Sequence, residues 1–357
     1  MFFIHLLNRS LLPAILIGSL PLLAAHAEDS SPAAGLENKT IEIAFATNRL
    51  KVDGKKGPDR FGNDPGPLTY GTCKVEFDPI GFLKNAARHI SLRFPTELEE
   101  IIALTEMTSD EFWSSFRESA GPGGRKVVFY IHGYNMDFDK ACRRTALMMR
   151  QLGPDVVLLL FAWPSQNNFA LYTKDETFLK TSMPDIRTVL EHMLAAFGNG
   201  VVDAIGHSLG TRGVTGAIAG MEAQEAPLFD ELVLIAPDMD RFDFENALPT
   251  LSRTVHGTTI YASENDGPLR ASQEVHGVPR IGQAGEYLML FDGVETIDIS
   301  NAPRRDIYGH NYHYFNPRIT DDVRILLTEG TRAGGRPGLL VKSVNGKTYW
   351  EMNQGEE

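Results

Sequence analysis

This sequence has few cysteines and no concentration of positive charge. Its 357 residues include only Cys73 and Cys142, too few for a small domain framed by disulfides. No Cys-x-x-Cys pair is present, so a common signature of zinc or redox sites is missing. Lys and Arg number 34 against 46 Asp and Glu, which gives a net charge of −12. This balance disfavours nucleic acid as a partner and favours a small-molecule substrate.

Motifs for metal and phosphate chemistry are also missing. There is no His-Glu-x-x-His segment, and His310 and His313 lack a third ligand at metal spacing. Gly346-Lys347-Thr348 is similar to the end of a phosphate loop, but Val341 stands where that motif requires glycine. We therefore expect neither a metal nor a cofactor.

Residues 1–27 have the composition of a secretory signal peptide. Arg9 is their only charge, and residues 11–25 are apolar apart from Ser19. Ala25-His26-Ala27 then supplies small residues at the positions that signal peptidase reads. The apolar run is short for a bilayer span and contains two prolines, although an uncleaved anchor is the alternative. We expect a mature chain with no stable membrane span that is periplasmic or secreted from a bacterium.

The rest of the chain predicts one domain, residues 28–338, followed by a C-terminal hairpin and tail at 339–357. Residues 41–47 and 69–77 alternate in the manner of strands, with a loop predicted between them. The pattern at 95–120 predicts a helix, which could pack on a sheet edge or act as a lid. In the lid alternative it would line an acyl pocket together with Trp163 and Phe169.

The two cysteines are expected in the core. Cys73 alternates with Val75 and Phe77 in a strand-like run, and Cys142 lies on the apolar face of a predicted helix. Because an exported chain can form disulfides, a bridge between them is the alternative.

After residue 120, short apolar runs alternate with helical segments. Strands are predicted at 127–131, 156–162, 201–205, 231–236, 258–262 and 296–299, and helices at 138–152, 177–197, from 209, and at 320–327. Strands that are apolar throughout, each followed by a helix, indicate a mostly parallel sheet with helices on both faces. The fold class is therefore a doubly wound α/β architecture.

The segment Gly206-His207-Ser208-Leu209-Gly210 lies between one of these strands and a helix. This is the context of a nucleophile elbow, in which glycines on either side let the chain make a strained turn around the serine. An acyl-transfer site also needs backbone donors for an oxyanion, and we assign them to Leu209 and to Tyr134, which follows an earlier strand. The alternative role for Ser208 is a plain helix cap.

A base and an acid should follow the serine along the chain. His310 is the first choice of base, because it lies in a loop after the last predicted strand, and His313 is the reserve. Asp266 is the favoured acid because it follows the strand before that loop, and Asp238, after the preceding strand, is the alternative. His132 precedes the nucleophile and is expected to be structural, and His276 is expected in a loop or at the surface.

Several segments together resemble a bacterial α/β-hydrolase family of largely uncharacterised, often exported proteins of the esterase/lipase superfamily. They are Ala46-Thr47-Asn48-Arg49, Tyr70-Gly71-Thr72-Cys73, His132-Gly133-Tyr134-Asn135, Phe161-Ala162-Trp163-Pro164-Ser165, Gly206-His207-Ser208-Leu209-Gly210, Ala236-Pro237-Asp238, residues 263–269 and Gly309-His310. The resemblance implies an α/β-hydrolase fold and a serine hydrolase, and it supports Ser208, Asp266 and His310.

The resulting hypothesis is an enzyme that cleaves a small-molecule carboxylic ester through an acyl-enzyme. An amidase, thioesterase or acyltransferase would use the same three residues. A non-catalytic binding protein of the cell envelope on a hydrolase fold is the alternative from a different class.

Overall fold

The computed structural model describes residues 40–79, 97–121, 124–303 and 308–353. The predicted signal peptide lies outside these described residues. Among the described helices, none is both long enough and apolar enough to cross a bilayer.

The described strands form one sheet, in the order β10-β11-β9-β8-β7-β6-β4-β5-β1-β2-β3. Pairing is parallel from β1 through β5, β4, β6, β7, β8 and β9 to β11, and antiparallel in β1–β2–β3 and β10–β11. The strands are β1 (Thr40–Lys51), β2 (Phe61–Pro79), β3 (Glu97–Met107), β4 (Lys126–Ile131), β5 (Val156–Phe161), β6 (Val202–His207), β7 (Phe229–Ile235), β8 (Val255–Ala262), β9 (Val294–Asp298), β10 (Leu339–Val344) and β11 (Lys347–Met352).

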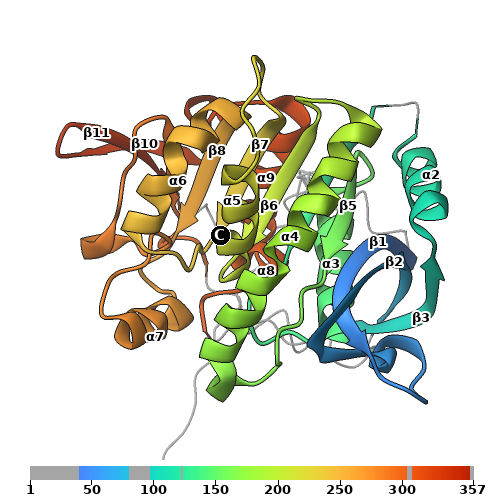
Figure 1. Cartoon of the computed structure of the whole chain (residues 1–357). Coiled ribbons are helices and arrows are strands. Elements are labelled where there is room, and N and C mark those ends of the chain that lie inside the picture. Colours follow the sequence, from blue (N-terminus) through green and yellow to red (C-terminus); the bar gives the residue numbers. More distant parts are fainter. Residues whose placement is uncertain (1–39, 80–96, 122–123, 304–307, 354–357) are drawn as a thin grey trace, which may run out of the picture. The chain divides into compact units, whose positions relative to one another are not determined.

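Helices cover both faces of this sheet (Figure 1). They are α2 (Ser109–Ala120), α3 (Phe138–Leu152), α4 (Tyr172–Phe197), α5 (Gly210–Ala219), α6 (Arg241–Thr254), α7 (Gly267–His276), α8 (Tyr312–Phe315) and α9 (Pro317–Glu329), with 3-10 turns at Gly57–Arg60, Phe169–Leu171, Gly285–Tyr287 and Ala333–Gly335. One core layer lies between the sheet and α2, α4, α5 and α6, and the other between the sheet and α3, α8 and α9.

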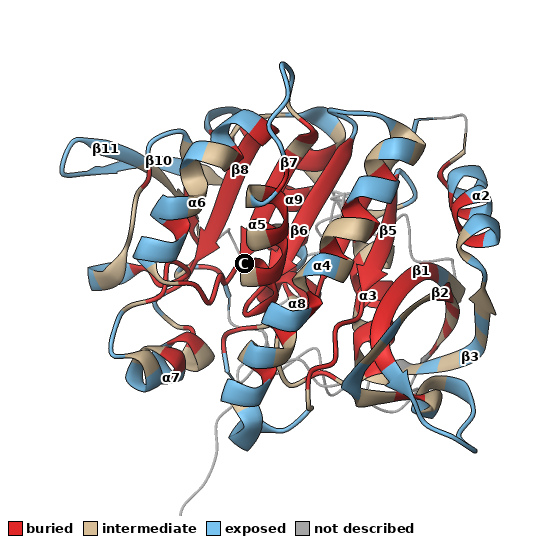
Figure 2. Cartoon of the chain, in the orientation of Figure 1, coloured by how far each residue is buried: buried red, intermediate tan, exposed pale blue. Residues whose placement is uncertain are grey.

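The central strands are buried along their whole length (Figure 2). In β4, Val127 and Phe129 contact the first core layer, whereas Val128 and Tyr130 contact the second. Successive strand side chains point to opposite faces, so a strand between two helical layers must be apolar at every position. The predicted doubly wound architecture is confirmed.

The prediction of a single helix over residues 95–120 is wrong for the first half of that segment. β3 occupies that half and pairs with β2, and α2 begins only after the capping box of Thr108 and Glu111. The pairing shifts register at Ile102, which is left unpaired and 46% exposed. This bulge places Ile101 and Leu104, three residues apart, on the same buried face. That spacing imitates a helix in the sequence.

One further expectation changes in detail, and one of two alternatives is favoured. The loop predicted between the first two strands shrinks, because β1 and β2 stay paired as far as Lys51 and Phe61. Helix α2 packs on the sheet edge, with Phe112 stacked on Tyr70 and Phe116 against Phe197 of α4.

Cys73 and Cys142 are both buried, as expected of core residues, and both are free thiols. Burial and the neighbouring Cys142 thiol raise the pKa of Cys73 well above its ordinary value. Near the other edge of the sheet, β10 and β11 form a hairpin in which Asn345 and Gly346 have φ of 52° and 77°. This is the geometry of a type I′ turn.

Candidate active site

Ser208 lies in the tight turn between β6 and α5, at the carboxyl end of the central strands. Its φ is +52°, a left-handed conformation that costs a non-glycine residue free energy and needs close support. The two flanking glycines allow the turn. A Cβ at Gly206 would lie 2.9 Å from Cα of Thr211, and one at Gly210 would lie 2.3 Å from the carbonyl oxygen of His132. The turn is therefore a strained elbow enclosed by backbone.

The loop after β4 passes directly over this elbow. A Cβ at Gly133 would lie 2.8 Å from Cβ of Ser208, so only glycine lets the loop approach the serine this closely. The next residue, Tyr134, lines the same pocket as Ser208. Leu209 is buried at the N-terminal end of α5, where the backbone dipoles of the helix favour negative charge. The structure thus brings Tyr134 and Leu209, the residues predicted to supply the oxyanion donors, close to the serine.

Buried polar residues outside the predicted catalytic set hold this loop in place. Arg49 at the end of β1 is fully buried and donates hydrogen bonds to the carbonyl oxygens of Met136 at 2.8 Å and Ser165 at 3.3 Å. The Ser165 hydroxyl accepts a hydrogen bond from the Met136 amide at 3.2 Å and donates one to Asp175 at 2.5 Å. The Asn135 amide also faces Asp175, at 3.5 Å. Together these groups fix the backbone of the loop.

Asn48 and Thr47 extend the same support. The Asn48 amide donates to Ser182 and Asp185 of α4, both at 2.9 Å, and the Thr47 hydroxyl donates to the carbonyl of Ala162 at 2.6 Å. The Thr47-Asn48-Arg49 segment therefore joins β1 to α4 and to the loops beside the elbow.

His132 is structural, as expected. Its ring stacks on Trp163 with centroids 5.3 Å apart, and its Nδ1 lies 2.7 Å from the carbonyl oxygen of Gly133. Burial, helped by the positive charge of Arg49, lowers the pKa of His132 to about 3. This imidazole therefore stays neutral near pH 7.

His310 and Asp266 form a buried pair. Nδ1 of His310 lies 2.7 Å from Oδ2 of Asp266, and the two side chains are 6% and 0% exposed. The other oxygen of Asp266, Oδ1, accepts the amide of Leu269 and so caps the N-terminus of α7. These two contacts fix the orientation of the carboxylate. In this orientation Asp266 can favour the imidazole tautomer that carries its proton on Nδ1.

The loop that carries His310 packs against the elbow. Nε2 of His207, the residue before the serine, lies 3.2 Å from the carbonyl oxygen of His310, and the two rings are 4.8 Å apart. The serine, the histidine and the aspartate therefore gather at one end of the sheet, from three segments far apart in the sequence.

The reserve base His313 lies behind this group. Its ring is 4.1 Å from that of His207 and 3.8 Å from that of Tyr314, and its Nε2 faces the Tyr130 hydroxyl at 3.4 Å. Burial and the neighbouring His310 lower the pKa of His313 well below its ordinary value. Within the described hydrogen bonds and ion pairs, His313 has no carboxylate partner.

Asp238, the alternative acid, is held by other groups. Its carboxylate accepts hydrogen bonds from Tyr172 at 2.5 Å, Ser272 at 2.6 Å and Arg280 at 3.0 Å. Burial would raise the pKa of Asp238, but Arg212 and Arg280 outweigh it and lower the pKa below its ordinary value. His276, expected in a loop or at the surface, ends α7 partly buried, with Nε2 2.8 Å from Glu176.

A pocket of about 110 Å³ opens beside Ser208. It is lined by Tyr134, Phe169, Tyr172, Ser208, Asp238, Pro268, Ala271, Ser272 and Val275. Phe169 is among them, as the lid alternative anticipated, but neither Trp163 nor the predicted segment 95–120 is among these described lining residues. The pocket is mainly apolar, with polar groups near the serine, as is common in small-molecule sites.

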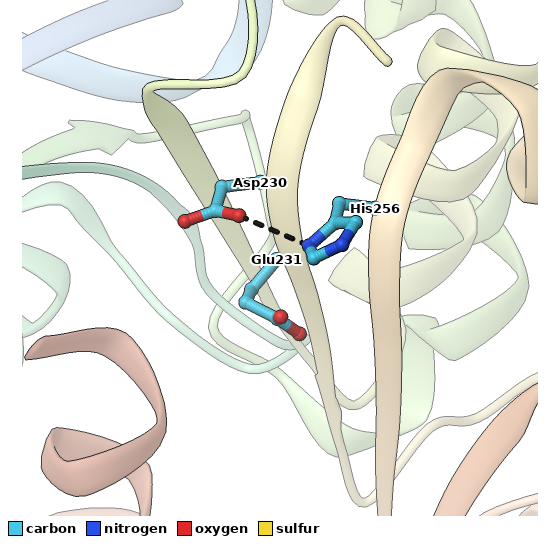
Figure 3. Close-up of side chains that lie close together, drawn as sticks. All are labelled: Asp230, Glu231 and His256. Carbon is cyan, nitrogen blue, oxygen red and sulfur yellow. Dashed lines mark ion pairs between the residues drawn. The ribbon is translucent and has the colours of Figure 1, made fainter. Parts of the chain in front are cut away.

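Another polar cluster lies at the opposite ends of the strands, where β7 and β8 begin (Figure 3). Asp230 lies 3.4 Å from Nδ1 of His256 and 2.9 Å from Nζ of Lys126, and Glu231 pairs with Arg332 at 2.5 Å. One ligand atom of each residue lies within 4.8 Å of the others, and Figure 3 marks an ion pair only between Asp230 and His256. Because lysine and arginine already neutralise these carboxylates, the cluster fits a metal ion poorly.

Comparison with known proteins supports this fold. A family model described as "Alpha/beta hydrolase of unknown function (DUF900)" matches residues 111–329, more than half of the 357-residue chain. No curated protein sequence matches the chain.

Solved structures with similarity to the chain include three bacterial, archaeal or metagenomic proteins. The lin2722 gene product of Listeria innocua is 14% identical over 65% of this chain and 100% of its own, with a TM-score of 0.35. EstE1, a carboxylesterase cloned from a metagenomic library, is 12% identical over 82% and 90%, with a TM-score of 0.34. An esterase of Pyrobaculum calidifontis is 10% identical over 82% and 86%, with a TM-score of 0.35.

Proposed function

We propose that the chain, which belongs to this family of α/β hydrolases of unknown function, is a serine hydrolase that cleaves carboxylic esters. One observation carries the proposal. The strained serine elbow, at φ +52°, packs through His207 against the loop of a histidine whose Nδ1 is 2.7 Å from a buried aspartate. Strained backbone and a buried imidazole–carboxylate pair both have a free-energy cost, and a catalytic site is where such costs are commonly found together.

In the proposed mechanism Ser208 Oγ attacks the ester carbonyl while Nε2 of His310 takes the hydroxyl proton. Asp266 stabilises the imidazolium through Nδ1–H. The Tyr134 and Leu209 amides donate to the oxyanion of the tetrahedral intermediate. His310 then protonates the departing alcohol, which leaves the acyl group on Ser208.

The second half of the reaction repeats these roles with water. His310 takes a proton from water as its oxygen attacks the acyl carbonyl, and then returns a proton to Ser208 as the acid leaves. An amine or thiol leaving group in the first half would make the enzyme an amidase or a thioesterase, and a second alcohol in place of water in the second half would make it an acyltransferase. Because the same catalytic residues serve all of these reactions, only an experiment can identify the leaving group and the acceptor.

The test combines hydrolysis of p-nitrophenyl esters with labelling by a fluorophosphonate. We expect Ser208→Ala to abolish labelling and to lower kcat by roughly a millionfold. Ser252→Ala is the matched control, because Ser252 is an exposed serine on α6 and should leave both signals unchanged. Labelling and hydrolysis that persist in Ser208→Ala would contradict the mechanism, and a wild-type protein without either would favour a binding protein.

We also propose that residues 1–27 direct export and are removed. The proposal rests on their sequence, with one charge at Arg9 and small residues before Glu28. Sequencing the N-terminus of protein expressed with the full leader should find Glu28 first. An intact Met1 on membrane-bound protein would support the anchor alternative instead.

A further inference from the structure

Two cavities lie on either side of one group of hydrogen-bonded side chains near the serine. The smaller, of about 110 Å³, is the pocket at Ser208. The larger, of about 540 Å³, is a groove between α4, α5 and α6 whose lining includes Glu176, Arg212 and Leu209. Leu209 directly follows Ser208, so the groove comes within one residue of the nucleophile without containing it.

The side chains between the two cavities are Tyr172, Asp238, Arg212 and Glu176, which we call the partition. Tyr172 and Asp238 line the pocket, and their side chains are joined by a hydrogen bond of 2.5 Å. Arg212 and Glu176 line the groove and are joined by an ion pair of 2.6 Å.

Arg212 also joins the two halves of the partition. Its Nε donates to the carbonyl oxygen of Asp238 at 2.5 Å, and its Nη2 donates to the Tyr172 hydroxyl at 3.2 Å. The carboxylate of Asp238 is further held by Ser272 and by Arg280, whose side chain is 1% exposed. Because each member has at least two partners, the partition is a fixed wall rather than a loose side chain.

We propose that this partition limits the acyl group of the substrate to a short chain, by separating the Ser208 pocket from the larger groove. The inference rests on the proposed ester hydrolase and names its substrate class as esters of short-chain acids. An apolar cavity of about 150 Å³ holds benzene, with six carbons, so about 110 Å³ scales to an acyl group of about four carbons. The alcohol part lies at the mouth of the pocket, where Phe169 and Val275 are each 62% exposed.

The groove has the apolar lining that a longer acyl chain of the substrate would need. Leu179, Met183, Met239 and Ala247 supply apolar surface along it. If the partition were opened, additional methylenes could extend into this volume, and each buried methylene would contribute about 0.8 kcal/mol, or about fourfold in kcat/KM. Four added methylenes would then amount to a gain of roughly 200-fold at most.

The first experiment measures kcat/KM of the wild-type protein for p-nitrophenyl acetate, butyrate, octanoate and palmitate. We expect a maximum at acetate or butyrate and a fall of at least tenfold at octanoate. A second series keeps butyrate as the acid and lengthens the alcohol, where we expect a fall of less than threefold. A wild-type preference for octanoate, or a length limit on the alcohol instead, would overturn the inference.

The second experiment opens the partition with Arg212→Ala and Tyr172→Ala. In each we expect the octanoate-to-butyrate ratio of kcat/KM to rise at least tenfold. Tyr172→Phe keeps the ring and should keep the wild-type ratio. Lys180→Ala is the matched control, because Lys180 lines the groove but is not part of the partition, and it should also keep that ratio.

Fluorophosphonate labelling separates the possible failures. A variant that labels at Ser208 and keeps the wild-type ratio counts against the partition. If both opening variants fail to fold and label, the wild-type acyl series alone decides. Absence of labelling and of hydrolysis in the wild-type protein would instead refute the proposed hydrolase.

Discussion

Replacing Arg49 by methionine should test whether this side chain supports the loop over Ser208 or only stabilises the fold. The guanidinium donates to Met136 in the loop over Ser208 and to Ser165 beside it, and also to Asn63 at 2.8 Å and Gly62 at 3.2 Å. Methionine fills a similar length with no donor. The loop that carries the Tyr134 amide then loses its fixed support at Met136, while the core stays filled.

Two terms oppose each other in the expected change in stability. Four hydrogen bonds from a charged donor are lost, each contributing about 1.5–3 kcal/mol, and their buried acceptors are left without that donor. Burial lowers the pKa of Arg49 to about 10, so the fold disfavours its charged form by about 3 kcal/mol, and methionine removes that cost. Because the lost bonds outweigh this gain, we expect the free energy of unfolding to fall by roughly 3 kcal/mol or more.

The expected change in rate is large. Misplacing one oxyanion donor costs about a hundredfold or more in turnover, and a shift of 1 Å in a catalytic group has a similar effect. The assay is kcat and KM for p-nitrophenyl butyrate, with thermal unfolding measured on the same samples. We expect kcat to fall about a hundredfold and KM to change less than threefold, because the loop acts in the transition state.

Arg336→Met is the matched control. Arg336 is equally buried and pairs with Asp322 at 3.3 Å, but none of its described contacts involves the loop after β4. It should alter stability without altering kcat. An Arg49→Met variant that kept kcat within threefold would show that the residue only stabilises the fold.

Three further predictions concern the site and the sheet below it. Asp266→Asn should lower kcat about 10⁴-fold, whereas folded Asp238→Asn should lose less than tenfold with p-nitrophenyl butyrate; the reverse order would make Asp238 the acid. Gly133→Ala places a methyl group 2.8 Å from Cβ of Ser208, so kcat and fluorophosphonate labelling should both fall at least a hundredfold, and normal labelling would contradict the close approach. Burial raises the pKa of Asp203 to about 7, so its ionised form destabilises the fold above pH 7, and that cost disappears as the pH falls towards 4. Asp203→Asn should therefore be more stable than wild type by up to about 4 kcal/mol at pH 8 and nearly equal at pH 4, as measured by urea unfolding, and a difference independent of pH would argue against the shift.

The parallel part of the fold could be predicted from the sequence because its signal is local. β4 and β5 are apolar at nearly every position and each is followed by a helix, which is typical of a sheet covered on both faces. β3 could not be predicted, because its bulge at Ile102 gives the buried side chains a helical spacing. A bulge depends on the partner strand, which local periodicity does not record.

The candidate site also contains residues that the sequence predicts and residues that it does not. Ser208 has a local signal, two glycines in a strand–turn–helix context, and the chain order of an α/β hydrolase led to Asp266 and His310. Arg49 and Asp175 have no such signal, because their partners are backbone groups of loops far away in the sequence. The segment around Arg49 was part of the family resemblance, but only the fold shows which groups it contacts.

The Asp266 carboxylate links helix α7 to His310, the proposed base. One carboxylate oxygen caps the first turn of α7, and the other holds His310. The same helix supplies Ala271 and Val275 to the wall of the pocket. A movement of α7 that widened the pocket would also draw the carboxylate away from the imidazole, so this wall cannot open while the base stays poised. Changes of specificity that preserve turnover should therefore arise on the Tyr172 side of the pocket.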